Sequence, residues 1–268
     1  MFGWLLDSHD ICLIQEHWLF NEHLNQLNFN PDFLSVGVSG MDSSILLRGR
    51  PFGGCAILFR KSLISSVTML STNAKRFCAI RLSDQYGYTV LLICVYLPTE
   101  YAMSSSRDDF LYVISELEGF INSQSFNSLV IAGDFDVDFE RCSPNTLQLI
   151  QFMEEFDLVS VDHSYHANVQ FTYEGCNSSS WIDHILTSRH FASCFTSVQK
   201  LDIATNLSDH HPLSGIFDYS LCSTPHLVPP TVSQFAPRTA WYNVNDSDIH
   251  NFCYMISDSL PTLPSDLV

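Results

Sequence analysis

The feature that most constrains the fold is a series of short apolar segments of strand length, separated by turn-forming and polar residues. Their lengths favour buried or half-buried strands over long helices. No repeats or low-complexity tracts interrupt the series. The predicted strands are 10–16, 54–59, 77–82, 88–97, 128–135, 158–162, 170–174, 182–188 and 213–219.

Helical spacing occurs in only two places. Residues 107–122 carry one apolar stripe, and residues 144–156 follow a plausible cap at Ser143 and a proline at the first helical position. In the second helix we expect Leu147, Ile150 and Met153 to face inward. Many strands with few helices predict an α/β fold, a mixed-sheet sandwich rather than a strictly alternating parallel sheet.

The domain organisation follows from a change in composition. The 268 residues, 46% of them hydrophobic, suffice for one large core, which we place in 1–221. Residues 222–268 are proline-rich at first and read as a linker with one possible short helix. No apolar stretch is long enough to cross a membrane and no signal peptide is evident, which favours a nuclear or cytoplasmic, unsecreted protein.

Cysteine content and charge narrow the function. The nine cysteines are odd in number and lack CxxC spacing, so we interpret them as reduced packing residues. The formal charge of −17 argues against general DNA binding and weakly for cation binding. A local basic groove stays possible, because a field depends on where charges lie. The oligomeric state is left open.

Polar residues suited to metal or phosphate chemistry occur at the ends of five apolar segments. They are Glu16, Tyr96, Asp134, Asp183 and the pair Asp209 and His210. In sandwiches and open α/β sheets such strand ends converge on catalytic sites. One such coincidence carries little weight, whereas five together predict a site.

Metal-assisted hydrolysis of a phosphodiester is the chemistry that needs this set. Glu16 and Asp209 supply the carboxylate oxygens that Mg²⁺ prefers, and Mn²⁺ is a possible substitute. Asp134 can accept a proton from the attacking water. His210 can hydrogen-bond a phosphoryl oxygen while Asp183 fixes its imidazole. Tyr96 can donate its hydroxyl to a phosphate oxygen.

Six motifs in order resemble the endonuclease/exonuclease/phosphatase superfamily, and most of all the apurinic/apyrimidinic-endonuclease-like domain of non-LTR retrotransposons. The resemblance covers roughly residues 5 to 218, and an ordered series is far more specific than any one motif. The motifs are "ICLIQEHWL" (11–19), "GGCAILF" (53–59), "CVYLP" (94–98), "IAGDFD" (131–136), "WIDHILTS" (181–188) and "LSDHHPL" (207–213).

The resemblance implies a four-layer α/β sandwich of two mixed sheets flanked by helices, a divalent metal and cleavage of phosphoester bonds in DNA. By matching motifs it implies a metal carboxylate at Glu16, a phosphate-contacting Tyr96 and a catalytic Asp134. It likewise implies that Asp183 supports the histidine of the terminal Asp209 and His210 pair. The tail resembles the segment that joins such a domain to a reverse transcriptase, which would then be a partner domain.

Two departures from the family pattern stand out. The family begins with a strand that carries an active-site asparagine, and this strand and most of the helix after it are expected to be missing here. Loss of the strand would leave unpaired backbone groups on its neighbours. Asp136 stands where the family has a substrate-binding asparagine, and a carboxylate accepts hydrogen bonds but donates none unless it is protonated.

Structural interpretations compete with these assignments. His17, His184 and His211 adjoin motif residues but fall on the opposite strand face, so packing or solvent exposure is expected for them. Trp18 and Trp181 are expected to pack, and Asp138 to lie outside the chemistry. Two alternative functions stay open: a superfamily phosphoesterase acting on a phospholipid or small molecule, and a degenerate, non-catalytic fragment.

Overall fold

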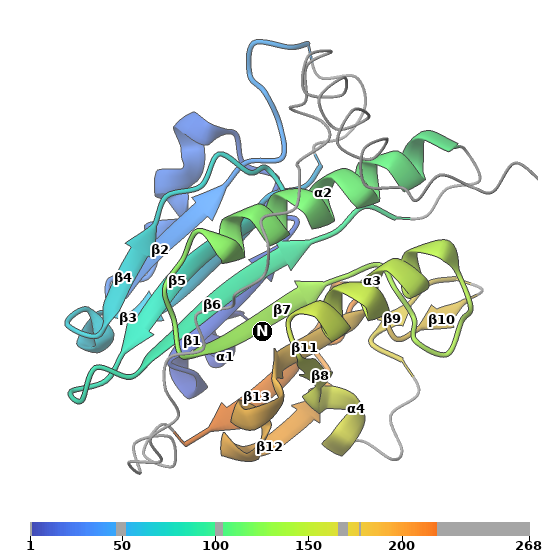
Figure 1. Ribbon diagram of the computed structural model, residues 1–268. Helices are drawn as coiled ribbons and strands as arrows, with labels where there is room; N and C mark the ends of the chain where they lie inside the picture. Colours follow the sequence, from blue (N-terminus) through green and yellow to red (C-terminus); the bar gives the residue numbers. More distant parts are fainter. Residues whose placement is uncertain (1, 47–51, 100–103, 166–170, 177, 219–268) are drawn as a thin grey trace, which may run out of the picture. The chain divides into compact units, whose positions relative to one another are not determined.

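The fold is described from a computed structural model, which covers residues 2–46, 52–99, 104–165, 171–176 and 178–218 (Figure 1). The predicted domain boundary near 222 and the possible helix after it lie outside the described residues. Both stay predictions. No helix among the described residues is long and apolar enough to cross a membrane.

A central sheet of six strands organises the chain. Its order is β4-β5-β6-β7-β11-β8, and the pair β6–β7 is parallel while its other pairs are antiparallel. Apolar side chains fill both faces of β5, β6 and β7, because the sheet is covered on both sides. The strands are β4 (Val67–Leu70), β5 (Phe77–Ser83), β6 (Thr89–Tyr96), β7 (Ser128–Asp134), β11 (Asp183–Ser188) and β8 (Leu158–Ser160).

Two helices cover one face of this sheet (Figure 1). Helix α2 (Ser104–Asn122) joins β6 to its parallel neighbour β7, which requires a crossover connection. Helix α3 (Pro144–Glu155) begins as predicted, because Ser143 Oγ accepts a hydrogen bond from the Thr146 amide at 3.2 Å. Its predicted inward face is wrong in part. The face buries Leu149 and Phe152, whereas Leu147 and Ile150 are exposed.

A second layer of strands lies against the other face. It contains the antiparallel sheet β1-β3-β2 and the antiparallel ribbon β12–β13. Apolar side chains from both layers form one core between them. The strands are β1 (Ile11–Gln15), β3 (Cys55–Arg60), β2 (Phe33–Val38), β12 (Phe195–Lys200) and β13 (Leu213–Phe217).

Two short helices complete the sandwich on the outside of β1-β3-β2. Leu6 from α1 (Phe2–Ser8) and Leu27 from η1 (Asn21–Asn28) pack with Phe33, Ala56 and Leu58. The layers are therefore helix, sheet, sheet and helix, so the four-layer prediction is confirmed. Smaller elements are η2 (Lys61–Leu63), α4 (Val161–Tyr165), β9 (Tyr173–Glu174), β10 (Ser179–Ser180) and η3 (Arg189–Cys194).

Strands β1 and β13 each have one unpaired edge within the described part of the chain. Strand β1 pairs with β3 on one side, and β13 pairs with β12. His9 Nε2 and Ser214 Oγ, 2.8 Å apart, connect the two sides at one end. The proposed absence of a first strand is compatible with this arrangement and stays a prediction.

Cysteine packing agrees with the sequence for most positions. Cys55, Cys78, Cys94 and Cys194 are buried, and the seven cysteines of the described ranges are all free thiols. Cys142 and Cys176 are exposed, so the packing interpretation is wrong for these two.

Candidate active site

Three neighbouring strands of the central sheet bring polar side chains to one edge. Tyr96 at the end of β6 pairs in register with Asp134 at the end of β7, and Asp134 pairs with Asp183 at the start of β11. Directly paired residues project from the same face of a sheet. The sheet register alone therefore places these three predicted residues side by side.

Gly133 allows β7 to approach β6 closely just before Asp134. Its φ is +144°, and a Cβ atom at this position would lie 2.1 Å from the Val95 carbonyl oxygen. No side chain fits there without moving the backbone. The glycine of the "AGDF" segment is thus required by the strand that presents Asp134.

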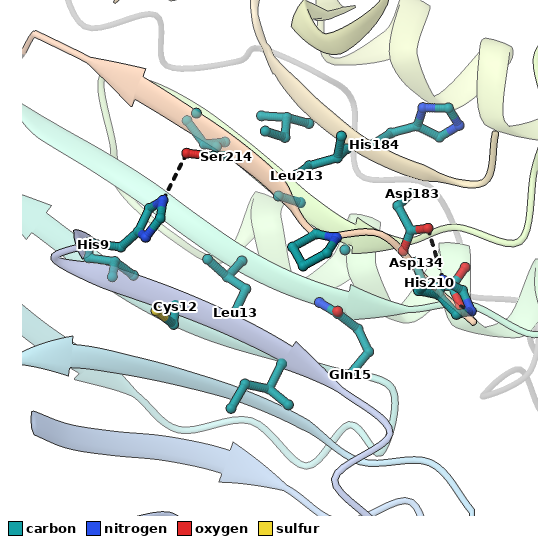
Figure 2. A pocket seen from close by; sticks show the side chains of 18 of the residues that line it. His9, Cys12, Leu13, Gln15, Asp134, Asp183, His184, His210, Leu213 and Ser214 are labelled. Atoms are coloured by element: carbon teal, nitrogen blue, oxygen red, sulfur yellow. Dashed lines mark hydrogen bonds and ion pairs between the residues drawn. The ribbon is translucent and has the colours of Figure 1, made fainter. Parts of the chain in front are cut away.

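His210 approaches this edge from the loop before β13 and contacts both aspartates (Figure 2). Its Nδ1 lies 2.9 Å from Asp183 Oδ2, and its Nε2 lies 3.9 Å from Asp134 Oδ2. The Tyr173 ring packs edge-on against the imidazole, with centroids 5.1 Å apart. The Asp183 contact is the one that an orienting role requires, and it leaves Nε2 directed toward Asp134.

Burial and charge shift the proton affinities of this group. Burial, together with the charges of Asp183 and Asp136, raises the pKa of Asp134 well above its usual value. Burial alone would lower the pKa of His210, but the hydrogen bond and charge of Asp183 outweigh it and raise that pKa to about 9. The metal-free site therefore combines a proton-attracting carboxylate with a charged imidazole at neutral pH.

Glu16 and Tyr96 form a second contact across the two sheets. The Tyr96 hydroxyl donates to Glu16 Oε1 at 2.5 Å, and the Arg76 guanidinium lies 4.9 Å from the centre of the Tyr96 ring. Burial and this hydrogen bond raise the pKa of Tyr96, so its phenol stays protonated. Glu16 adopts a left-handed backbone with φ of +54°, a conformation that non-glycine residues rarely adopt and that is enriched at functional sites.

Asp136 also has a left-handed backbone, with φ of +51°. Its amide donates to Asp134 Oδ1 at 2.9 Å, and its Oδ2 accepts from Thr99 Oγ1 at 2.7 Å. Burial raises its pKa. The side chain therefore lies beside the acids of the site, where it adds negative charge.

Asp209 lies next to His210 and is exposed to solvent. Its charge contributes to the raised pKa of His210. Glu16, Tyr96, Asp134, Asp136, Asp183, Asp209 and His210 all line one open cavity of about 2220 Å³. The structure thus brings every predicted site residue to the same cavity, while it records no contact between Glu16 and Asp209.

The donor set of this cavity suits a hard divalent cation. Carboxylate oxygens dominate, and the crowding of Asp134, Asp136 and Asp183 is the kind that a cation relieves. Ligand atoms of Asp134, Asp183 and His210 lie within 4.8 Å of one another, but Asp183 and His210 use theirs on each other. Glu16 and Asp209 line the same cavity, and their predicted role as ligands of the ion stays a prediction.

Sequence analysis missed two polar neighbours of the site, Thr99 and Arg76. Thr99 follows the "VYLP" motif and reaches Asp136, while Arg76 precedes β5 and lies over Tyr96. A polar residue three positions after Tyr96 was a usable signal for Thr99. Nothing in the local sequence distinguishes Arg76 from an ordinary surface arginine.

The residues expected to lie outside the site differ in their contacts and exposure. His17 bonds to the Val38 carbonyl oxygen and the Leu19 amide, and His184 is fully buried. Trp181 is 5% exposed and packs as predicted, but Trp18 is 46% exposed and lines the cavity, so the packing prediction is wrong for Trp18. Asp138 also lines the cavity, where its Oδ2 lies 3.2 Å from Arg141 Nε, and its place outside the chemistry stays a prediction.

Comparison with known proteins supports the resemblance. Residues 90–214 match the family model described as endonuclease-reverse transcriptase. No curated protein sequence matches the chain. Among solved structures, the AP endonuclease LMAP from Leishmania major is 12% identical with a TM-score of 0.63, covering 79% of this chain and 79% of that chain.

Two further solved structures share the fold. The 3′ phosphatase NExo from Neisseria, bound to a product DNA hairpin, is 19% identical with a TM-score of 0.58, covering 81% of this chain and 93% of that one. The endonuclease domain of TRAS1, a telomere-specific non-LTR retrotransposon, is 13% identical with a TM-score of 0.55, covering 81% and 89%. The chain therefore has the same sandwich fold as these three solved structures, and the predicted resemblance is confirmed at the level of the fold.

Proposed function

We propose that this chain hydrolyses phosphodiester bonds with a divalent metal, as the DNA-nicking endonuclease domain of a retrotransposon-derived protein. One observation carries the proposal. The buried Asp134 lies beside His210, whose Nδ1 bonds to Asp183 at 2.9 Å, at the convergence of three strands. A general base and an oriented imidazole within one cavity are the groups that such hydrolysis needs.

Asp134 accepts the proton of the attacking water, because its raised pKa gives it the proton affinity of a base. As the water oxygen bonds to phosphorus and the ester bond breaks, His210 Nε2 donates a hydrogen bond to the phosphoryl oxygen. Asp183 holds Nδ1 and so fixes the direction of Nε2. Tyr96 and Asp136 contact the phosphate, Asp136 as a donor only when protonated.

Glu16 and Asp209 would hold Mg²⁺, or Mn²⁺ in its place, since both carboxylates line the cavity. When bound, the ion neutralises charge that develops on the phosphate. Release of the Tyr96 hydroxyl from Glu16 would then free it to donate to the substrate.

The substrate and context are inferred from the relatives. The description of the matching family names both an endonuclease and a reverse transcriptase. Two of the similar structures are a DNA-bound phosphatase and a retrotransposon endonuclease. These support DNA as the substrate and a reverse transcriptase as a partner domain. A nuclear or cytoplasmic location stays a prediction from the sequence.

Plasmid nicking tests the proposal. The purified chain should convert supercoiled plasmid to the nicked form with Mg²⁺ and stop when the metal is chelated. Asp209→Ala and His210→Ala should each lower the rate at least ~100-fold. Equal nicking by these variants would mean that the activity belongs to a contaminant or another site.

A second candidate is hydrolysis of a phosphorylated lipid or small molecule. The charge of −17 favours it, because a long polyanion is repelled more than a small substrate. DNA, sphingomyelin and inositol phosphates should be assayed side by side at one ionic strength. Turnover of a small substrate without nicking would replace the endonuclease proposal.

A third candidate is a degenerate fragment without catalysis, favoured by the additional acid Asp136 beside Asp134. Calorimetric titration with Mg²⁺ addresses it directly. Binding that is lost in both Glu16→Gln and Asp209→Asn would argue against degeneration. An absence of Mg²⁺ binding by the intact, folded chain would favour it.

A further inference from the structure

His184 and Asp162 form a polar contact inside the protein, apart from the cavity chemistry described above. Both side chains are fully buried, and His184 Nδ1 lies 2.9 Å from Asp162 Oδ2. Buried charges are costly unless every polar atom has a partner. The contact therefore needs a structural or functional reason.

Asp162 is saturated by donors. Its Oδ1 accepts from the Ile185 amide at 2.9 Å and from Ser160 Oγ at 2.7 Å. Its Oδ2 accepts from Trp181 Nε1 at 3.0 Å as well as from His184. Burial would raise the pKa of Asp162, but the bonds and charge of His184 and these donors lower it overall. A carboxylate with four donors is ionised, so His184 Nδ1 carries a hydrogen.

The other ring nitrogen of His184 faces a second polar group. His184 Nε2 lies 2.8 Å from the Val137 carbonyl oxygen. The ring therefore lies between Asp162 and Val137 and contacts both. The Phe139 and Phe135 rings pack against it at centroid distances of 4.5 and 5.7 Å, which keeps water out.

Through its Nε2 atom, His184 connects two segments that carry catalytic acids. His184 follows Asp183 on β11, and Val137 follows Asp136 in the segment after β7. That segment has a left-handed residue at Asp136, a conformation that persists only where the surrounding structure holds it. The His184–Val137 bond is such a constraint.

We propose that His184 is a positioning residue, a buried side chain that holds the segment 135–138 against β11 and thereby sets the spacing of Asp134 from Asp183 and His210. This role rests on the proposed hydrolysis. The contact that holds the segment does not, because it follows from the distances alone. The two claims can therefore fail separately.

Kinetics of His184→Gln test the positioning role. Glutamine can donate to the Val137 carbonyl oxygen or contact Asp162, but it cannot span both. We expect kcat to fall ~10- to 100-fold, because small misplacement of reacting groups has a large effect, with KM nearly unchanged. A raised KM with normal kcat would overturn the proposal.

His163→Gln is the matched control. His163 stacks on Trp181 at 4.6 Å and lies 5.6 Å from His184, but no hydrogen bond of its ring to the 135–138 segment is recorded. Its kcat should stay within ~3-fold of the wild type. Equal kcat losses in the two variants, at matched melting temperatures, would mean that the cluster acts only through stability.

Amide hydrogen exchange of the metal-free protein tests the constraint without any activity assay. The Phe135 amide donates to the Ile182 carbonyl oxygen and the Asp136 amide donates to Asp134 Oδ1, each at 2.9 Å. Both amides should exchange slowly in the wild type and faster in His184→Gln. Unchanged exchange in His184→Gln would overturn the inference, even if the chain nicks DNA. Faster exchange in His184→Gln, in a chain that shows no activity, would leave the proposed hydrolysis alone refuted.

Discussion

Asp134 and His210 show how single residues acquire their chemistry from their surroundings. Neither side chain is unusual in sequence, but burial and two neighbouring acids raise the pKa of Asp134, and Asp183 raises that of His210 to about 9. The strand-end pattern was enough to predict that these residues and Tyr96 lie together. Arg76 and the Asp162–His184 contact were not predictable, because they depend on segments distant in sequence.

Titration of His210 in the metal-free protein follows from this geometry. NMR should give a pKa near 9 in the wild type, and Asp183→Asn should bring it back toward ~6.5. Because the folded pKa is raised, the stabilising contribution is complete below about pH 6.5 and is lost as the pH rises through about 9. A wild-type value at or below ~6.5 would contradict the Asp183 contact.

Asp136→Asn should raise the nicking rate. The carboxylate adds negative charge beside Asp134, whereas an amide can donate to a phosphate oxygen and can still accept from Thr99. We expect an increase of ~3- to 10-fold, within the range that one hydrogen bond contributes. Single-turnover nicking measures it, and an unchanged or lower rate would show that the carboxylate is not a handicap.

At the scale of elements, most strands with a clear apolar run were predictable, including the partly buried β1 and β13, whereas three less regular strands were not. Continuous apolar runs predicted β3, β5, β6, β7 and β11 within one or two residues. Strands β2, β4 and β12 are only partly buried and mix polar with apolar residues, so their sequences carried little signal. In α3 two apolar stripes compete, and tertiary packing selects the one with Leu149 and Phe152.

Paired substitutions in α3 test that choice of face. Leu149 is fully buried against α2 and the central sheet, so Leu149→Ala should lower the free energy of unfolding by about 2–5 kcal/mol. Ile150 is 39% exposed, and Ile150→Ala should cost less than about 1 kcal/mol. Urea denaturation followed by circular dichroism measures both free energies. A larger loss in Ile150→Ala than in Leu149→Ala would mean that α3 buries the face expected from the sequence.

For the whole molecule, the strand count and the polar strand ends predicted a layered α/β sandwich, which is confirmed. They could not predict how the strands divide between layers. The central sheet has six strands, and the second layer is split into β1-β3-β2 and β12–β13. Such pairing is set by contacts between segments far apart in sequence, which no local pattern records.

Within the described residues, β1 and β13 each have an unpaired edge. Such edges predict that the protein self-associates. Sedimentation velocity should show larger species as the concentration rises. A lysine on an edge strand opposes pairing, so Ile216→Lys on β13 should reduce this association. Ile64→Lys, at an exposed position outside the strands, should not. Equal self-association of the two variants would mean that the β13 edge does not mediate it.

The central claim is that Asp134 takes part in metal-dependent cleavage of phosphodiesters. Its most direct test compares plasmid nicking by Asp134→Asn and Asp138→Asn, the same chemical change on the same segment. We predict that Asp134→Asn loses at least ~100-fold of the rate, as expected for a general base, while Asp138→Asn stays within ~3-fold of the wild type. Equal rates in the two variants, both folded and both tested with Mg²⁺, would contradict the proposed site.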